Sequence, residues 1–491
     1  MAKLSVRLDD RVGTISPMLY GHFAEHLGRC IYEGLWVGED SPIANTRGVR
    51  DDTVAALRKL AAPVIRWPGG CFADDYHWRD GIGPRDERPR RLNVWWHDEE
   101  SNQFGTHEFI DLCRQVGAAP YICLNVGSGT PEEAAGWVEY SNCARNTSRA
   151  QERGLNGSPE PFAVRYWGVG NENWGCGGRF DPDDYAREYR RFACYLRGRS
   201  SSPIELVACG HTGPDWNRKF LDAIGDLRML DHLSIHRYYN CGDAVDFSDT
   251  EYYNLFPRAL QVEADVVEAA TAVALYNRPA KKIGVILDEW GVWHPEARGD
   301  SGLYQRNTLR DALTCAAVFD VLNHHADKVT MANIAQTINV LQCLCQTDGA
   351  AMWLTPTYHA FALYQPHMGN ASVRVDLDDI PTVAAREGDG REVALPVVSA
   401  SASVDEAGKA AVLTFQNLHL TEPCDCRIRL RGGSIAKATG KLLTARDVRD
   451  CNGPEAPRKI RPKRLTLEPK ATTLRIELPP HALASVRVVL R

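Results

Sequence analysis

The sequence predicts a (β/α)₈ TIM barrel followed by an all-β domain. Short, nearly continuous apolar runs recur over roughly the first 370 residues, and segments with helical periodicity separate them. After that point the pattern changes to strict alternation of apolar and polar residues, which is typical of antiparallel sheet. The alternative for the first part is a doubly wound open sheet.

Eight apolar runs have the character of parallel strands that are buried on both faces. They span residues 16–23, 63–67, 120–126, 166–171, 205–209, 233–238, 283–288 and 329–334. Eight strands that alternate with helices over about 350 residues match a barrel with insertions.

Helix start signals lie between these runs. Thr130-Pro131-Glu132-Glu133 reads as a capping box with Pro at the first helical position. Asp181-Pro182-Asp183-Asp184 places negative charge at the start of another helix. The apolar face of that helix follows at a helical spacing as Tyr185, Tyr189, Phe192 and Leu196. A third helix begins after Thr106, with Phe109, Ile110 and Cys113 on its apolar face.

The C-terminal part reads as a jelly-roll-like β-sandwich. Ile428 and Leu430 alternate with arginines, and Leu474 and Ile476 alternate with polar residues. Residues 4–8 near the N-terminus alternate in the same way, so we expect this strand to join the sandwich. The predicted domains are therefore a barrel over 15–370 and a sandwich made of 1–14 and 371–491.

Composition narrows the class of protein. The chain has 491 residues, of which 44% are hydrophobic and 24% charged, which excludes a disordered chain. The net charge is −6 and no basic block stands out, so we expect no nucleic-acid partner. We expect no membrane partner either, because no apolar stretch reaches about 18 residues.

The N-terminus and the cysteines point to the cytoplasm. The start MAKLSVRLDD lacks the apolar region of a secretory signal. Most of the fifteen cysteines stand singly in apolar surroundings, which favours buried free thiols in a reducing compartment over a disulfide framework.

Polar residues cluster where the predicted strands end. In a barrel these ends meet on one face, and catalytic groups lie there. Two glutamates stand out, Glu172 after the fourth strand and Glu289 after the seventh. Glycoside hydrolysis needs two carboxyl groups flanking one acetal bond, and these two could reach it from opposite rims. Asp288 should point elsewhere, because adjacent strand residues face opposite sides.

Three runs make the sequence familiar: GHFAEHLGR, YWGVGNENWGCGG and ILDEWGVW. Together with RWPGGCFADDYHWRDGIGP and MANIAQTINVLQ they resemble family 51 glycoside hydrolases, the α-L-arabinofuranosidases of the large retaining (β/α)₈ clan. The likeness extends from about residue 15 to residue 367 and is weaker in the sandwich.

The resemblance implies roles for individual residues. It makes Glu172 the acid/base and Glu289 the nucleophile of a retaining mechanism, for which carboxyl groups lie about 5 to 5.5 Å apart. Cys71 stands where some relatives carry Asn, and a thiol is a weaker hydrogen-bond partner. The further residues expected to line or support the sugar pocket are Glu25, Arg66, Cys71, Asn171, Trp174, His236, Tyr238 and Gln336.

Tryptophans near the strand ends are candidates for a sugar platform, although core packing explains at least half of them. Trp174 and the Trp95-Trp96 pair lie in predicted loops and are the best candidates for the aglycone side. The others are Trp67, Trp290 and Trp293.

Several motifs are set aside. His22-Phe23-Ala24-Glu25-His26 reads H-x-x-E-H, but a zinc-protease motif needs helical spacing and this segment closes a strand. Gly168-Val169-Gly170 lacks the third glycine of a dinucleotide loop. Two C-x-C pairs, at 343–345 and 424–426, give weak support for zinc. A sugar-binding protein without activity is the second functional class, and the presence of both glutamates argues against it.

The prediction is an exo-acting cytoplasmic α-L-arabinofuranosidase without a cofactor. Its expected partners are arabinofuranosyl-containing oligosaccharides of arabinan or arabinoxylan. The alternative keeps the fold and acts on β-xylosides, β-glucans or β-D-galactofuranosides. The resemblance also implies a homo-oligomer, often a hexamer.

Overall fold

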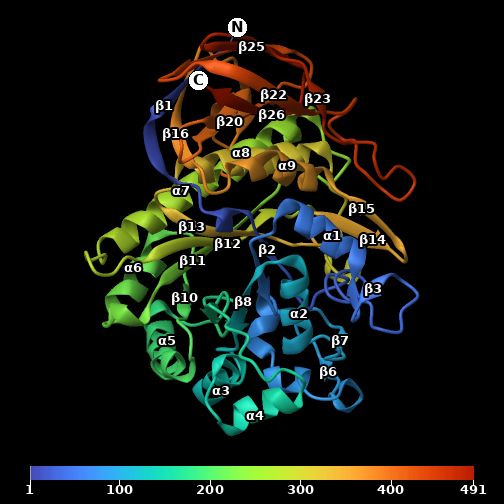
Figure 1. Cartoon of the computed structure of the whole chain (residues 1–491), viewed down its shortest axis with the longest axis vertical. Coiled ribbons are helices and arrows are strands. Elements are labelled where there is room, and N and C mark those ends of the chain that lie inside the picture. Colours follow the sequence, from blue (N-terminus) through green and yellow to red (C-terminus); the bar gives the residue numbers. More distant parts are fainter. Residues whose placement is uncertain (1) are drawn as a thin grey trace.

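The computed structural model describes residues 2–491 and contains a closed barrel of parallel strands. Around the barrel the strands follow their order in the chain (Figure 1). They are β2 (Gly21–Phe23), β5 (Val64–Trp67), β8 (Ala119–Leu124), β9 (Tyr166–Val169), β10 (Glu205–Cys209), β11 (His232–Tyr239), β12 (Gly284–Val292) and β13 (Val329–Ile334). The barrel prediction is confirmed, and the open sheet is excluded.

The first predicted strand is too long at its start. Pro17–Tyr20 form the 3₁₀ helix η1 instead, and only Gly21–Phe23 pair into the barrel. The reason is local: the Ser16 side chain accepts a hydrogen bond from the Met18 amide, and Pro17 occupies the first helical position.

Helices surround the barrel and begin where the sequence signals predicted. The Thr130 hydroxyl accepts from the Glu133 amide at the start of α3. The Glu133 carboxylate bonds His77 at 2.9 Å instead of returning to the cap, so the predicted capping box is only half formed. The α-helices are α1 (Asp51–Leu60), α2 (Thr106–Val116), α3 (Pro131–Asn142), α4 (Ser148–Leu155), α5 (Pro182–Leu196), α6 (Pro214–Ala223), α7 (Asp249–Ala274), α8 (Leu309–His324) and α9 (Pro356–Tyr364).

A ten-stranded sheet with its own apolar core forms the C-terminal part (Figure 1). Ile428 and Leu430 point into this core, while the intervening arginines are exposed. In sheet order the strands are β23 (Lys463–Leu465), β22 (Ile435–Leu443), β26 (Ala482–Leu490), β20 (Ala410–Asn417), β19 (Val398–Val404), β16 (Ala371–Asp378), β1 (Ala2–Thr14), β21 (Cys424–Arg431), β25 (Thr473–Leu478) and β24 (Glu468–Lys470).

The first strand of the chain lies inside this sheet. β1 pairs antiparallel with β16 and parallel with β21. The expectation that the N-terminal strand joins the C-terminal sheet is therefore confirmed for residues 2–14, and the boundaries 1–14 plus 371–491 and 15–370 stay a prediction. Four two-stranded ribbons complete the fold: β3 (Asn45–Thr46) with β4 (Val49–Arg50), β6 (Arg91–Leu92) with β7 (Glu99–Glu100), β14 (Cys345–Asp348) with β15 (Ala351–Leu354), and β17 (Thr382–Arg386) with β18 (Glu392–Pro396).

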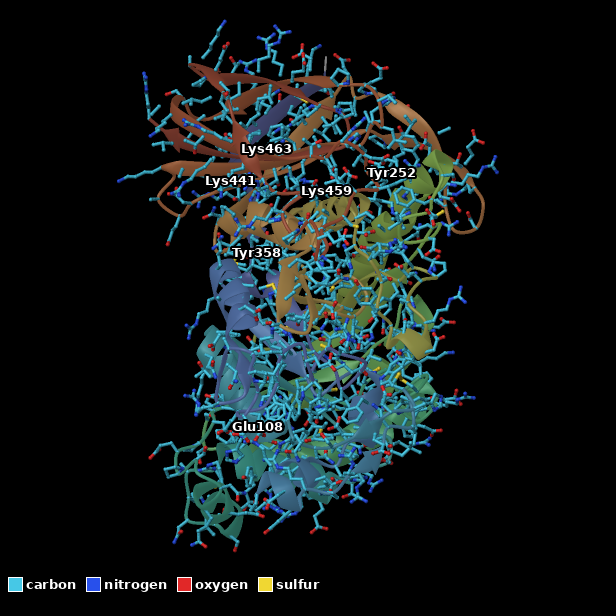
Figure 2. All side chains as sticks on the ribbon, turned by 90° about the vertical axis from the view of Figure 1, so that its right-hand side faces the viewer. Glu108, Tyr252, Tyr358, Lys441, Lys459 and Lys463 are labelled. Carbon is cyan, nitrogen blue, oxygen red and sulfur yellow. A yellow bond between two sulfur atoms is a disulfide. The ribbon has the colours of Figure 1, made fainter. Side chains whose placement is uncertain are left out.

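The sheet rests on α8 and α9 (Figure 1). Buried polar contacts fix this junction, among them Asn323 Nδ2 to Ser401 Oγ at 3.1 Å. A groove of about 910 Å³ lies along it, with Tyr358 on the barrel side and Lys441 and Lys463 on the sheet side (Figure 2). None of the predicted site residues lines this groove. The junction therefore connects the barrel to the sheet and does not form part of the candidate site. Among the described residues, no helix combines the length and apolar character of a membrane span.

Candidate active site

The predicted acids meet at one end of the barrel. Glu172 follows β9, Glu289 lies near the end of β12, and His236 lies between them on β11. One carboxylate oxygen of each glutamate and one His236 ring nitrogen all lie within 4.8 Å of one another. This cluster is the centre of the candidate site.

Glu289 is buried and held from two sides. Arg66 Nη1 donates to Oε1 at 2.7 Å, and the Tyr238 hydroxyl donates to Oε2 at 2.7 Å. His236 Nδ1 lies 3.6 Å from Oε2. Burial by itself would raise the pKa of Glu289, but the His236 and Arg66 charges and the hydrogen bonds from Tyr238 and Arg66 bring it below its ordinary value. Glu289 is therefore ionised, as a nucleophile must be.

A β-bulge places Glu289 and changes the expectation for Asp288. Ile235 pairs with Leu287, but the next residue, His236, pairs with Glu289, which leaves Asp288 as the extra residue. Simple alternation therefore fails here, and both carboxylates contact Arg66. Asp288 Oδ2 lies 3.2 Å from Arg66 Nε and accepts from the Tyr121 hydroxyl at 2.8 Å. The prediction that Asp288 points elsewhere is wrong, because Asp288 and Glu289 share Arg66 as a partner.

Glu172 is the more accessible acid, with its side chain 20% exposed against 6% for Glu289. Its Oε1 accepts from His236 Nδ1 at 3.0 Å. Its backbone has a φ of 42°, in the left-handed region that side chains rarely adopt. Such strain is found where the fold holds a functional residue in place. His236 touches both acids, and although burial lowers its pKa, Glu289 and Glu172 raise it above the ordinary value.

Arg66 connects Glu289 to Asn171, the residue that precedes Glu172 in the chain. Arg66 Nη2 donates to Asn171 Oδ1 at 2.6 Å, which turns the Asn171 Nδ2 group away from the arginine. Burial would lower the pKa of Arg66, but Asp288 and Glu289 raise it well above its ordinary value, so the guanidinium stays charged. The arginine therefore orients one acid and one amide together.

Glu25 and Gln336 come together near Glu289, because a Cβ at Gly70 would lie 3.0 Å from Glu289 Oε1 and 3.5 Å from Glu25 Oε1. Gln336 Nε2 donates to Glu25 Oε2 at 2.8 Å, and Trp96 Nε1 and the Phe72 amide approach Oε1 at 3.3 Å each. Burial and the charge of Glu289 raise the pKa of Glu25 to about 7. The chain runs close by at Gly69, where a Cβ would lie 2.6 Å from the Glu25 side chain. Only glycine fits at this approach.

The tryptophans separate into core and site. Trp67 and Trp290 are fully buried in the core. Trp96 contacts Glu25, as given above, and Trp174 stacks on His211 with ring centroids 4.1 Å apart. Trp293 packs against the Tyr238 ring at 5.4 Å. For the exposed Trp95 no contact with the site residues is found among residues 2–491.

Cys71 is not the free thiol that the sequence suggested. It forms a disulfide with Cys176, and the two Cα atoms are 5.5 Å apart. The other thirteen cysteines, all within residues 2–491, are unpaired there. The two partners are 105 residues apart in the chain, and only the fold brings the loops after β5 and β9 together. Predicting free thiols was therefore wrong for Cys71 and Cys176.

Asp74 is a residue that connects the loops around the candidate site and was not among the predicted site residues. Asp74 Oδ1 accepts from the Val126 and Gly127 amides, and Oδ2 accepts from the Asn171 amide at 2.7 Å. Burial raises the pKa of Asp74 to about 7 although these amides oppose the shift. Asp74 thereby joins the loops that follow β5, β8 and β9. The one available signal was its place in the run RWPGGCFADDYHW.

The motifs set aside do not converge in space. His22 stacks on Phe361 with ring centroids 5.4 Å apart, whereas His26 Nδ1 contacts Glu100 at 2.6 Å. The two imidazoles of the H-x-x-E-H motif thus have separate surroundings. Cys424 and Cys426 lie on one buried face of β21 with their sulfurs 3.7 Å apart.

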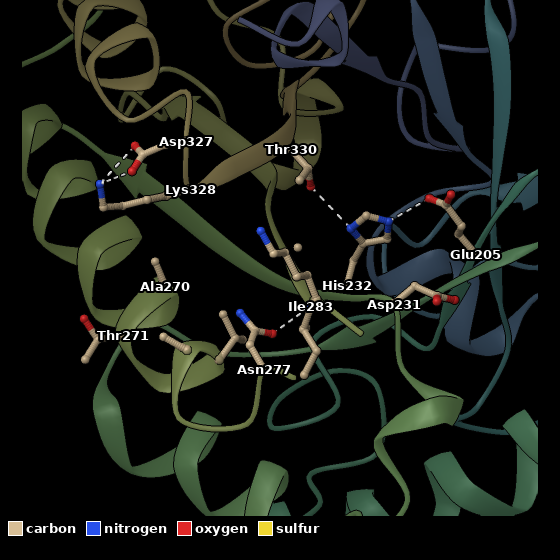
Figure 3. A pocket seen from close by; sticks show the side chains of 14 residues that line it. Glu205, Asp231, His232, Ala270, Thr271, Asn277, Ile283, Asp327, Lys328 and Thr330 are labelled. Atoms are coloured by element: carbon tan, nitrogen blue, oxygen red, sulfur yellow. Dashed lines mark hydrogen bonds and ion pairs between the residues drawn. The ribbon is translucent and has the colours of Figure 1, made fainter. Parts of the chain in front are cut away.

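The opposite end of the barrel has a charged pocket of about 610 Å³ (Figure 3). His232 lies between Glu205, at 2.8 Å, and Thr330, at 3.3 Å. Lys328 pairs with Asp327. These groups bond one another instead of converging on a shared point, so the catalytic candidates remain those at the carboxyl ends of the strands.

Comparison with known proteins identifies the family. Two family models match, the α-L-arabinofuranosidase 1 domain over residues 56–254 and the α-L-arabinofuranosidase C-terminal domain over 288–482. An intracellular exo-α-L-arabinofuranosidase of Bacteroides ovatus is 39% identical over 99% of this chain and 95% of its own length. The chain belongs to the α-L-arabinofuranosidase family.

Solved structures agree with this assignment. The family 51 arabinofuranosidase of Xanthomonas axonopodis pv. citri superposes with a TM-score of 0.93 at 37% identity, over 99% of both chains. The arabinose complex of the Thermotoga maritima α-L-arabinofuranosidase gives 0.86 at 34% identity, over all of both chains. The fold and the family predicted from the sequence are thus confirmed.

Proposed function

We propose that the protein is a retaining exo-α-L-arabinofuranosidase that releases terminal arabinofuranosyl groups from oligosaccharides of arabinan or arabinoxylan. The observation that carries this proposal is that one carboxylate oxygen of Glu172 lies within 4.8 Å of one carboxylate oxygen of Glu289 at the carboxyl ends of the strands. A short separation supports a retaining enzyme, since an inverting one needs room for water between its acids. Membership of the α-L-arabinofuranosidase family supports an arabinofuranosyl group as the sugar that is released.

The first step uses the different surroundings of the two acids. Glu289, kept ionised by Arg66 and His236, attacks the anomeric carbon. Glu172 donates its proton to the glycosidic oxygen as the bond from carbon to that oxygen breaks. The product of this step is an arabinosyl ester of Glu289 and a free aglycone.

The second step reverses the roles. Glu172 takes a proton from water, and the resulting hydroxide attacks the anomeric carbon and displaces Glu289. Two successive inversions leave the sugar with its original configuration. His236 bonds Glu172 and faces Glu289, so its position supports a role in orienting both acids.

The remaining residues would bind sugar. The Asn171 amide is oriented by Arg66 beside the nucleophile, a suitable place to donate to the sugar 2-hydroxyl. Glu25 and Gln336 form a connected acceptor and donor pair for further hydroxyls. Trp174 and Trp96 would cover the pocket rim. The sulfur of Cys71 is occupied in the disulfide with Cys176, so it would not bind sugar as a thiol.

Replacing Tyr238 by Phe should shift the acid limb of the pH profile. Glu289 reacts only when ionised, and the Tyr238 hydroxyl helps to keep its pKa low. Loss of this donor raises that pKa, so the acid limb of kcat/KM moves to higher pH, by about one unit. Tyr239→Phe is the matched control, because the Tyr239 hydroxyl is buried without a partner among the described residues. An unchanged acid limb in Tyr238→Phe would contradict this account.

The sugar is tested with a matched panel of nitrophenyl glycosides. It comprises the α-L-arabinofuranoside, β-D-xylopyranoside, β-D-galactofuranoside and β-D-glucopyranoside. We expect the arabinofuranoside to be cleaved with a kcat/KM at least about tenfold above the others, the discrimination that a shaped pocket gives. Preference for another glycoside would overturn the assignment of arabinofuranose as the substrate sugar but would not contradict the roles of the two carboxylates. No cleavage at all would reopen the sugar-binding alternative.

The proposed assembly and location rest on the family resemblance and not on the geometry. The resemblance supports a homo-oligomer, a hexamer in particular, which light scattering coupled to size exclusion would test. The cytoplasm is the proposed location, supported by the name of the Bacteroides ovatus relative. This mechanism needs no cofactor, nucleic acid or membrane.

A further inference from the structure

The Cys71–Cys176 disulfide lies against the proposed acid/base. Cys176 Sγ is 3.7 Å from Glu172 Oε2 and 3.9 Å from Asn171 Nδ2. Cys71 directly follows Gly70, where a Cβ would lie 3.0 Å from Glu289 Oε1. The disulfide therefore joins two loops that carry or border both catalytic carboxylates.

Cys71, Cys176 and Glu172 have the arrangement of a metal site. The two sulfurs and one Glu172 oxygen all lie within 4.8 Å of one another, and all three residues are partly exposed. Glu172, His236 and Glu289 form a second group within the same distance, which shares Glu172 with the first. Two sulfurs and a carboxylate, with an imidazole or water as the fourth ligand, match tetrahedral Zn²⁺.

The oxidation state decides whether this site exists. Disulfide sulfurs are poor ligands, whereas thiolates bind zinc strongly. We propose that Cys71 and Cys176, once reduced, bind one thiophilic divalent cation such as Zn²⁺ together with Glu172, and that the disulfide form is the active, metal-free state. The site itself does not depend on the proposed function. Only its inhibitory effect rests on the proposed role of Glu172.

The chemistry balances with a dithiol as reductant. The dithiol passes two electrons to the bond between the sulfurs and becomes a cyclic disulfide, and two protons go to Cys71 and Cys176. Zinc binding then releases these two protons to solvent. Once zinc coordinates the Glu172 carboxylate, that group can neither donate nor accept the proton of the catalytic cycle.

The test compares oxidised and dithiol-reduced enzyme after removal of the reductant without air. We expect the reduced enzyme to bind about one more Zn²⁺ per chain than the oxidised enzyme. Arabinofuranoside hydrolysis by the reduced enzyme should then fall by about 10²-fold or more, the range expected when a general acid is blocked. A chelator should restore the rate. The comparison needs no mutation, and the other thirteen cysteines are thiols in both samples.

Variants locate the site. Cys176→Ser and Cys71→Ser should each lose the additional zinc, while Cys424→Ser should keep it, although Cys424 belongs to another close pair of sulfurs. Equal zinc in oxidised and reduced wild type, or additional zinc retained by reduced Cys176→Ser, would overturn the site. Zinc bound at this site without loss of rate would overturn its inhibitory effect. Because zinc is measured directly, these results are separate from a failure of the glycosidase assignment.

Discussion

Replacing Glu289 by Ala should lower kcat on the arabinofuranoside by on the order of 10⁴-fold, because removing a catalytic nucleophile has effects of this size. That loss corresponds to about 5.5 kcal/mol of activation free energy. Glu289 is the only one of the two acids that Arg66 and Tyr238 hold in its ionised form. No general base can replace it, since the step forms a bond to its own oxygen.

Glu289→Gln is the matched control for this prediction. It keeps the size of the side chain and the Tyr238 contact but removes the charge, so it should be as inactive as the alanine variant. Unfolding temperatures of both proteins will separate loss of catalysis from loss of fold. Substantial activity in Glu289→Gln would show that the nucleophile lies elsewhere.

Replacing Glu172 by Ala should have an effect that depends on the leaving group. For oligosaccharides the departing hydroxyl needs a proton, so kcat/KM should fall by about 10²- to 10⁴-fold. A dinitrophenyl arabinofuranoside releases dinitrophenolate, which leaves without a proton. For this substrate, formation of the covalent intermediate should be nearly normal and hydrolysis of the intermediate should be slow. The measurement is a pair of pre-steady-state and steady-state rates on both substrates.

Azide provides the internal control for Glu172. As an anionic nucleophile it needs no general base, so it should restore turnover of the dinitrophenyl substrate and yield an arabinosyl azide of retained configuration. An equal loss on both substrates, with no azide rescue, would contradict the acid/base role.

The sequence was sufficient for the barrel because buried parallel strands are nearly continuous apolar runs. It was equally sufficient to predict that Glu172 and Glu289 lie together, since strand ends in a barrel converge on one face. It could not show the bulge at Asp288, because a register shift depends on pairing with β11 and leaves no local signal. The sequence did not predict η1, because the residues around Pro17 are apolar and an apolar run can form either a strand or a helix.

Long-range pairings were the other gap. The Cys71–Cys176 bond and the three amides that Asp74 accepts from join loops far apart in the chain. Their partners become visible only when β5, β8 and β9 are neighbours in the barrel. The pocket residues that were predicted one by one, such as Glu25 and Gln336, came from the family resemblance and not from spacing.

The most direct test of the central claim is to trap the covalent intermediate. Glu172→Ala is mixed with dinitrophenyl α-L-arabinofuranoside, quenched in acid and analysed by intact mass and peptide mapping. The account predicts a mass increase of one arabinosyl group, located on the peptide that contains Glu289. A burst of dinitrophenol without a labelled protein, or a label on any residue other than Glu289, would contradict it.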